Sequence, residues 1–232
     1  MAARGKFIAI EGIDGAGKRT QCELLNQALQ ARGIVCAPFS FPRYDSTFGR
    51  LIAAFLNGDL GQPDTIDAHF SALLYAGDRL EAKPNLEAAL AAGKTILADR
   101  YVASNLAHQG ARVDSEQRAE FLSWVRHVEY DIYGLPAENL LIYLRLTPSE
   151  AQKLVGRKPA RSYTTRQRDL LEADLSHLER AAAVYDLLAA DDSRWVTIEC
   201  FDAAASTLRS PEQIHREVLE AVGSRVFSGT TA

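Results

Sequence analysis

A glycine-rich turn near the N-terminus limits the possible folds of this chain more than any other segment. The turn runs from Gly12 to Thr20 with the sequence GIDGAGKRT, and it separates an apolar run at 6–10 from a stretch with helical periodicity. Glycines let the backbone curl so that several N–H groups point at one anion, and the N-terminus of the following helix adds partial positive charge. Lys18 brings a full positive charge to the outer phosphates of a nucleotide. The pattern G-x-x-x-x-G-K between a strand and a helix predicts a phosphate-binding loop (P-loop); the alternative is a turn that binds nothing. The residues predicted to line the nucleotide site are Gly12, Ile13, Asp14, Gly15, Ala16, Gly17, Lys18, Arg19 and Thr20.

The residue after Lys18 departs from the usual pattern of this loop. The usual loop has Ser or Thr at that position, where the hydroxyl ligates Mg²⁺. Here Arg19 follows the lysine, and the hydroxyl of Thr20 lies one residue later, about 100° further round the helix. Because arginine has no acceptor atom, we expect Arg19 to be an extra cation near the phosphates. Carboxylates elsewhere then have to hold the Mg²⁺, and the candidates are Asp14, Asp99 and Glu172.

Beyond the loop, short apolar runs alternate with longer stretches of helical periodicity. The apolar runs predict five buried strands, at about 6–10, 34–41, 95–98, 140–146 and 195–200. Helices are expected at about 17–31, 115–133, 169–190 and 211–222, after a capping box at Thr147, and in three pieces between 47 and 92 that break near 58–63 and at Pro84. This alternation predicts the three-layer α/β/α fold of the P-loop NTPases, with a central five-stranded parallel sheet. No linker divides the chain, so we expect one domain over residues 1–232.

The composition narrows the possible functions. Hydrophobic residues make up 47% of the chain and charged residues 24%, which is typical of a globular protein. A net charge of −4 is not typical of nonspecific nucleic-acid binding, and no apolar run is long enough to span a membrane, so we expect neither partner. We see no signal-peptide pattern at the N-terminus. Three cysteines without a C-x-x-C spacing argue against disulfides or a zinc site and favour the cytoplasm.

Arginines follow two of the predicted strands. The second strand leads into FPRY, which carries Arg43, and the third leads into Asp99 and Arg100. Because the carboxyl ends of parallel strands meet at one edge of a sheet, both arginines are expected to face the P-loop. A third arginine, Arg79, lies in the segment YAGDR on a predicted helix.

Taken together, these segments resemble the thymidylate kinase family of P-loop nucleoside monophosphate kinases. The matching pieces are EGIDGAGKRT, FPRY, YAGDR, DRYVASN, GLP and DLLEADLSHLERAAAVY, in order from Glu11 to about Tyr185. The P-loop, FPRY and DRYVASN are most similar to the actinobacterial branch of the family. The resemblance implies phosphorylation of dTMP to dTDP with ATP and Mg²⁺, by a homodimer that pairs through helices beside the acceptor site. Two alternatives stay open: a kinase for another nucleoside monophosphate such as UMP or dUMP, and a catalytically silent nucleotide-binding protein.

The resemblance also implies which residues hold the phosphate and sugar of the acceptor. Arg100 and Arg43 would bind the acceptor phosphate, with Phe41 and Tyr44 beside it, and Asp14 would accept a hydrogen bond from the 3′-hydroxyl. Transfer between two polyanions depends on positioning and on cations, so Lys18, Arg100 and Asp14 are the catalytic candidates. The structural alternatives are a solvated surface position for Arg43 and an ion pair between the adjacent Asp99 and Arg100.

A second set of residues is implied for the base and the sugar. Tyr75 would stack on thymine, while Arg79 and Asn105 would hydrogen-bond to its edge. His108 takes the place of a tyrosine expected to crowd the 2′ position, so the choice of dTMP over UMP is less sharply implied. We expect Asp78 to position Arg79. The alternatives are core packing for Tyr75, a surface position for Arg79 and a helix N-cap for Asn105.

The basic stretch at 156–168, with the sequence GRKPARSYTTRQR, is predicted to be a lid that closes over ATP. The family takes a catalytic arginine either from the P-loop or from the lid, and Gly15 occupies the P-loop position here. The resemblance therefore implies a lid arginine, either Arg161 or Arg166, and alanine replacements assayed for kcat would separate them. A solvated surface loop is the alternative. Glu172 opens the next predicted helix, where helix capping is the alternative to a metal-binding role.

Overall fold

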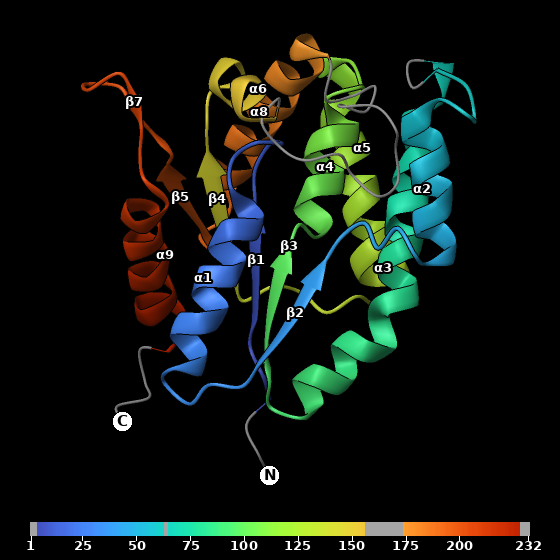
Figure 1. Cartoon of the computed structure of the whole chain (residues 1–232). Helices are drawn as coiled ribbons and strands as arrows, with labels where there is room; N and C mark the ends of the chain where they lie inside the picture. The colour runs from blue at the N-terminus through green and yellow to red at the C-terminus, as the bar shows by residue number, and fades with distance from the viewer. Residues whose placement is uncertain (1–3, 63–64, 156–173, 228–232) are drawn as a thin grey trace.

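Five short apolar strands form the central sheet of the protein, as the alternating pattern predicts (Figure 1). The computed structural model describes residues 4–62, 65–155 and 174–227. All strand pairs of this sheet are parallel, in the order β2-β3-β1-β4-β5. The prediction of a five-stranded parallel sheet is confirmed. The strands are β1 (Phe7–Glu11), β2 (Cys36–Ser40), β3 (Thr95–Asp99), β4 (Leu140–Arg145) and β5 (Trp195–Glu199).

Helices cover both faces of the sheet and complete the three layers. On one face, α1 (Lys18–Gln30) packs beside α9 (Pro211–Val226). On the other side lie α3 (Ala68–Ala91), α4 (Val102–Gly110) and α8 (Leu175–Asp191), with α5 (Ser115–Arg126) against α4 (Figure 1). The helix α2 (Thr47–Asn57) packs on α3, and α6 (Pro148–Val155) follows β4. No helix within the described ranges is long and apolar enough to cross a membrane.

Three helix boundaries differ from the sequence prediction. Pro84 lies inside α3, so the predicted break there is wrong. Proline bends a helix by removing one N–H donor, but Leu86 and Leu90 beyond it are buried in the core, and this packing keeps the turn helical. The helix predicted from about 169 starts at Leu175 in the described part of the chain, because Asp174 has an extended backbone. The helix predicted at 115–133 continues from α5 as the π-helix η2 (His127–Ile132).

A small hairpin was not anticipated from the sequence. The two-residue strands β6 (Phe201–Asp202) and β7 (Thr207–Leu208) pair antiparallel after β5. Strands this short carry no period-2 pattern that a sequence can reveal.

Two apolar clusters fix the elements around the site. The larger one contains the fully buried strand residues and the inward faces of the covering helices. The smaller one joins α2 to α3 through Ile52, Phe55, Leu56 and Leu74, and Tyr75 packs against it. The two clusters hold the loops at the carboxyl ends of the strands on a rigid base.

The register of the sheet brings three of these loops together. Asp99 at the end of β3 lies opposite Ile10 of β1 and Ser40 of β2. The chain then continues the pairing, because Arg100 donates its backbone N–H to the carbonyl oxygen of Ile10 at 3.1 Å, and Phe41 donates to that of Asp99 at 3.0 Å. The P-loop, the FPRY segment and Arg100 therefore start from neighbouring points.

A buried carboxyl group lies before β4. Glu138 is 3% exposed and accepts a hydrogen bond from the hydroxyl of Tyr130 at 2.8 Å. Burial raises the pKa of Glu138 to about 7, and the charge of Glu11 adds to the effect. The folded chain thus keeps a proton on Glu138 that the unfolded chain releases near its ordinary pKa of 4.5.

We expect Glu138→Gln to remove a pH dependence of stability. A carboxyl whose pKa is raised by folding lowers the free energy of unfolding as pH rises from about 4.5 to about 7. The difference between the variant and the wild type should therefore shift in favour of the variant by about 2–3 kcal/mol between pH 5 and pH 8. Urea unfolding at both pH values measures it. Glu220→Gln, at an exposed position of α9, is the control, and an equal shift in both variants would contradict the assignment.

Candidate active site

The residues Gly12–Gly17 form a tight loop between β1 and α1, and Lys18–Thr20 make the first turn of α1. Gly12, Gly15 and Gly17 have φ values of 139°, 95° and 89°, in the left-handed region that favours glycine. Lys18 is 6% exposed, and its ammonium group donates to the carbonyl oxygen of Ile13 at 2.9 Å. The loop thus has the glycine conformations and the inward lysine that the motif predicts.

Gly15 lies directly against α6. A Cβ at this position would be 2.5 Å from the carbonyl oxygen of Ala151 in α6. At Gly17, by contrast, a Cβ would meet no atom of the described residues within 4 Å. Position 15 therefore has no room for a side chain unless α6 moves, which agrees with the expectation that the P-loop supplies no arginine from this position.

The two residues after Lys18 face outward. The side chain of Arg19 is 86% exposed and pairs with Glu23, one turn later in α1, at 2.9 Å. Thr20 is exposed as well. A role for Arg19 beside the phosphates stays a prediction, because its guanidinium contacts the helix surface in this structure.

Arg100 joins the end of β3 to the P-loop. Its Nη2 lies 2.8 Å from Oδ1 of Asp14, and its Nη1 donates to the carbonyl oxygen of Gly12 at 3.3 Å. Burial lowers the pKa of Arg100, but the acidic groups around it, with Asp14 contributing most, together outweigh burial and raise this pKa well above its ordinary value. Among the described residues, Arg100 therefore forms its ion pair with Asp14 and not with Asp99, so the alternative of a structural pair with the adjacent aspartate is wrong. Arg100 also has a φ of 69°, which is uncommon for a residue with a side chain.

A buried polar network lies behind Arg100. Glu11 at the end of β1 is fully buried and accepts hydrogen bonds from the backbone N–H of Tyr101 at 2.7 Å and from the hydroxyls of Ser104 at 2.6 Å and Tyr185 at 3.0 Å. Ser104 also accepts from Nη1 of Arg100 at 2.9 Å. The network links β1, α4 and α8 to the backbone and side chain of Arg100.

His108 lies on α4 beside this network. Its Nε2 is 3.2 Å from Nη1 of Arg100, and its Nδ1 is 3.5 Å from Nε2 of His177 on α8. Burial, together with the charge of Arg100, lowers the pKa of His108 well below its ordinary value. Burial also lowers the pKa of His177 to about 4. Both rings are neutral at pH 7.

The FPRY segment turns Arg43 toward α3. Asp78 accepts from the backbone N–H of Arg43 at 2.8 Å and from its Nε at 3.1 Å, and Nη2 of Arg43 donates to the carbonyl oxygen of Asp78 at 2.8 Å. The expectation that Asp78 positions Arg79 is therefore wrong, because Asp78 holds Arg43. The side chain of Arg43 is 24% exposed, so a solvated surface position does not describe it either.

Arg79 is buried and forms a two-point ion pair. Its Nε and Nη2 donate to the two carboxylate oxygens of Glu129 in η2, at 2.5 Å and 2.6 Å. The side chains are 2% and 0% exposed, so the surface alternative for Arg79 is wrong. The carboxylate of Glu129 offsets the burial of Arg79, whose pKa is raised.

Asn105 completes this buried group. It lies inside α4, so the N-cap alternative is wrong. Its Nδ2 donates to the carbonyl oxygen of Ala72 at 3.0 Å and to Glu129 at 2.8 Å, whereas its buried Oδ1 has no hydrogen-bond partner among the described residues. Asn105 therefore offers an acceptor, not a donor.

The aromatic candidates have different surroundings. Tyr75 and Tyr44 are partly buried against the cluster between α2 and α3, as the packing alternative for Tyr75 expects. Phe41 is 4% exposed, and its ring lies 5.7 Å from that of Tyr101. Tyr44 and Tyr75 thus pack against the same small apolar cluster, while Phe41 belongs to the main core.

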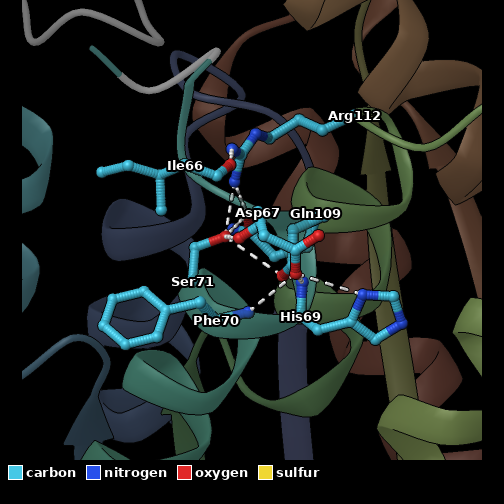
Figure 2. Close-up of polar contacts among 8 residues, drawn as sticks. Ile66, Asp67, His69, Phe70, Ser71, Gln109 and Arg112 are labelled. Atoms are coloured by element: carbon cyan, nitrogen blue, oxygen red, sulfur yellow. Dashed lines mark hydrogen bonds and ion pairs between the residues drawn. The ribbon is translucent and has the colours of Figure 1, made fainter. Parts of the chain in front are cut away.

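A polar cluster connects α3 to α4, the two helices that carry the base-side candidates. Figure 2 shows Arg112, just after α4, directed at Ser71 and at the carbonyl oxygen of Ile66. Arg112 also donates to Gln109 at 2.8 Å, and the hydroxyl of Ser71 donates to Gln109 at 2.9 Å. Asp67 caps the start of α3 by accepting from two backbone N–H groups (Figure 2). The cluster fixes the first turn of α3 relative to the end of α4.

Most of the chain matches one family of known proteins. Residues 10–216 match the family model described as thymidylate kinase. A thymidylate kinase of Mycobacterium tuberculosis is 35% identical over 195 residues, which cover 83% of this chain and 90% of that protein. The chain belongs to the thymidylate kinase family.

Other thymidylate kinases match over about two thirds of the chain or more. The human enzyme is 32% identical over 152 residues, 66% of each chain, and a probable thymidylate kinase of Pyrobaculum aerophilum is 32% identical over 219 residues, 93% of this chain and 95% of that one. A solved structure of thymidylate kinase from Candida albicans has a TM-score of 0.75 at 20% identity and covers 97% of this chain and 93% of that one. The family and the P-loop NTPase fold predicted from the motifs are confirmed.

For a thymidylate kinase, the carboxylates beside the P-loop fit a Mg²⁺ ion. Asp14 lies in the loop, and Asp99 lies opposite Ile10 at the same edge of the sheet. Among the described residues, no group of three or more metal-ligating side chains forms a cage. Mg²⁺ needs none, because it is bound by one or two carboxylates together with phosphates and water. Glu172, Arg161, Arg166 and the rest of the predicted lid lie outside the described residues.

Sequence reasoning missed the residues that hold the candidates in place. They are Glu11, Ser104, Glu129, His177 and Tyr185. One signal was available: Glu11 is a charged residue that ends an otherwise apolar run. Such a residue is rarely buried unless it has a partner.

Gly15→Ala and Gly17→Ala should distinguish the cost of a positive φ from the cost of a steric clash with α6. Both substitutions place a side chain at positive φ, which costs about 1–2 kcal/mol. Only Gly15→Ala also pushes against the backbone of α6. We therefore expect Gly15→Ala to lower the free energy of unfolding clearly more than Gly17→Ala does, as measured by urea unfolding without nucleotide. Equal losses would mean that α6 yields without cost.

Proposed function

We propose which of the described residues bind ATP, the phosphate of dTMP and the base in the reaction of this family. The chain is an ATP:dTMP phosphotransferase that forms dTDP, and ATP is its phosphoryl donor. The observation that carries the proposal is the contact between Arg100 and Asp14, because it places a cation between the P-loop and the end of β3. Donor and acceptor phosphates have to meet at such a point.

On the donor side, the main-chain N–H groups of the P-loop and Lys18 bind the phosphates of ATP. Lys18 is already buried in the loop, so little reorganisation is needed. We propose Asp14 and Asp99 as the residues that would hold Mg²⁺, with Glu172 as a further candidate from the sequence. When bound, Mg²⁺ neutralises charge on the transferring phosphoryl group. A magnesium–nucleotide complex with the Thr20 hydroxyl about 2.1 Å from the metal would contradict this assignment.

On the acceptor side, Arg100 and Arg43 bind the phosphate of dTMP. Asp14 holds the guanidinium of Arg100. Asp78, with Glu81 at 3.7 Å, holds that of Arg43. Each guanidinium has further N–H donors to give. Asp14 is placed to share its oxygens between Arg100 and the 3′-hydroxyl. A preoriented arginine loses less side-chain entropy when phosphate binds.

On the base side, Asn105 supplies an acceptor for N3–H of thymine. This is supported by its buried Oδ1, which has no partner in the part of the chain that the structure describes, and by its Nδ2, whose two donors are engaged. Arg79 provides the neighbouring donor, and Glu129 balances its charge. Tyr75 provides the flat aromatic face that suits the base.

The exposed face of α3 supports the proposed homodimer. Phe70, Leu73 and Leu80 are 52%, 37% and 38% exposed and follow one another at helical spacing, and Leu51 of the adjacent α2 is 40% exposed. Apolar side chains grouped in this way mark an interaction surface. The mass from sedimentation equilibrium tests the proposal, and a monomer at about 10 μM would contradict it.

The remaining parts of the proposal rest on the sequence. Residues 1–232 form one domain, supported by a single sheet that takes strands from both halves of the chain. The lid at 156–168 supplies Arg161 or Arg166 to the transferring group. The protein works in the cytoplasm, supported by its free thiols, Cys22, Cys36 and Cys200.

A coupled assay of ADP release tests the substrate directly. With ATP and Mg²⁺ present, we expect rapid turnover of dTMP and much slower turnover of UMP, dUMP, AMP, GMP and thymidine. Comparable kcat/KM for UMP and dTMP would contradict the preference for dTMP. Turnover of none of these compounds would favour a silent nucleotide-binding protein.

Replacing Tyr75 tests the base site within the same assay. Tyr75→Leu keeps the packing against the apolar cluster but removes the ring, whereas Tyr75→Phe keeps both. Loss of stacking on a base costs about 1–3 kcal/mol, so KM for dTMP should rise at least fivefold in the leucine variant and change little in the phenylalanine variant. KM for ATP should be unaffected in both. An unchanged KM for dTMP in Tyr75→Leu would exclude stacking.

A further inference from the structure

We propose that His108 is a positioning residue for Arg100, and that His177 in turn holds His108. His108 then acts through the guanidinium that binds the acceptor phosphate and not by contact with the 2′ position of the sugar. The inference rests on the role proposed above for Arg100.

The first contact fixes which nitrogen of His108 carries its proton. Nε2 of His108 lies 3.2 Å from Nη1 of Arg100. A guanidinium has only donors, so Nε2 must accept and cannot carry a hydrogen. The neutral ring therefore carries its proton on Nδ1.

The second contact uses that proton. Nδ1 of His108 lies 3.5 Å from Nε2 of His177, and the ring centroids are 5.7 Å apart. Nε2 of His177 is then the acceptor, and the ring of Tyr185 stands edge-on to His108 at 88°. His177 is 1% exposed, so α8 fixes its position. The direction of donation runs from Arg100 through His108 to His177.

The charged groups around His108 and His177 keep both rings neutral, and this preserves the direction of the hydrogen bonds from Arg100 to His177. Arg100 and Lys18 disfavour a positive charge on His108, and Asp14 only partly offsets them. Arg180 and Arg112 act in the same sense on His177, against Asp174. A protonated His108 would lose its acceptor and repel Arg100, so the neutral pair is the form that can orient the guanidinium.

The same contacts argue against a direct sugar role. Both ring nitrogens of His108 have protein partners, one on Arg100 and the other on His177. No ring N–H is left over to donate to a ribose hydroxyl. Ser104 and Gly12 accept from the same Nη1 of Arg100, so His108 belongs to a set of acceptors that hold this side of the guanidinium and leave Nη2 toward Asp14.

Removing the acceptor should weaken binding of the phosphate but not of the nucleoside. In His108→Leu we expect KM and the dissociation constant for dTMP to rise at least about tenfold, since a hydrogen bond to a charged group is lost. The inhibition constant of thymidine, which has no phosphate, should change less than about twofold on the same argument. The ratio of kcat/KM values for dTMP and UMP should stay constant, because both carry the phosphate that Arg100 binds.

Two further variants test the relay itself. His108→Gln retains an acceptor and should recover most of the loss in dTMP affinity. His177→Leu should weaken dTMP binding by itself but add nothing in the His108→Leu background, because residues in one network are not additive. His127→Leu, at an exposed position of η2, is the control that should behave as the wild type. Thermal unfolding of every variant shows whether a loss reflects the fold.

The outcomes separate the proposal from its rivals. An equal loss for dTMP and thymidine, or a changed dTMP-to-UMP ratio, would overturn positioning in favour of a direct sugar contact. Unchanged dTMP affinity in His108→Leu would overturn any role. If the wild-type protein turned over no dTMP, the proposed function would fail. If the wild type were active and His108→Leu bound dTMP as tightly as the wild type, only this inference would be refuted.

Discussion

The ion pair between Asp14 and Arg100 is the contact on which the arrangement of the site depends. It connects the P-loop, which follows β1, to the residue that follows β3, and the two strands pair directly with Ile10 opposite Asp99. Arg100 adopts a left-handed backbone that costs about 1–2 kcal/mol for a residue with a side chain. The surroundings offset that cost, because its own N–H bonds to Ile10 and the next N–H bonds to the buried Glu11. Strain that persists at such a position marks a functional junction.

The site manages its positive charge by giving each arginine a carboxylate. Arg43 pairs with Asp78, and the buried Arg79 pairs through Nε and Nη2 with both carboxylate oxygens of Glu129. A chain with a net charge of −4 can therefore hold several cations at one edge of its sheet without leaving them to repel one another. Buried pairs of this kind add little net stability, because desolvation consumes most of the attraction. Their value lies in orientation: in the function proposed above, a phosphate would meet guanidiniums that are already in place and would exchange or share partners with a carboxylate.

The sequence predicted the parts of the fold and site that local patterns determine. The glycine conformations around Lys18 follow from one contiguous motif, and the five strands follow from apolar runs between helical stretches. The sequence predicted a helix break at Pro84, because the burial that maintains the helix beyond this proline comes from tertiary packing. Asp78 was assigned to its sequence neighbour Arg79, whereas the fold turns it to Arg43, 35 residues away. Glu129 gave no local signal, because it meets Arg79 only through the π-helix η2.

The sequence therefore does not predict which side chains pair with one another across the fold. His108 shows why this matters for substrate specificity. From the motif alone, a histidine in place of tyrosine is a smaller side chain facing the sugar. The fold adds His177, 69 residues later, and Arg100, 8 residues earlier, and these two partners occupy both ring nitrogens. The sequence alone suggests that histidine at position 108 leaves more room beside the sugar. In the inference drawn above, this histidine instead orients Arg100, which is proposed to bind the acceptor phosphate. On this proposal, discrimination at the 2′ position would come from the shape left around that fixed ring, because both ring nitrogens of the histidine have protein partners.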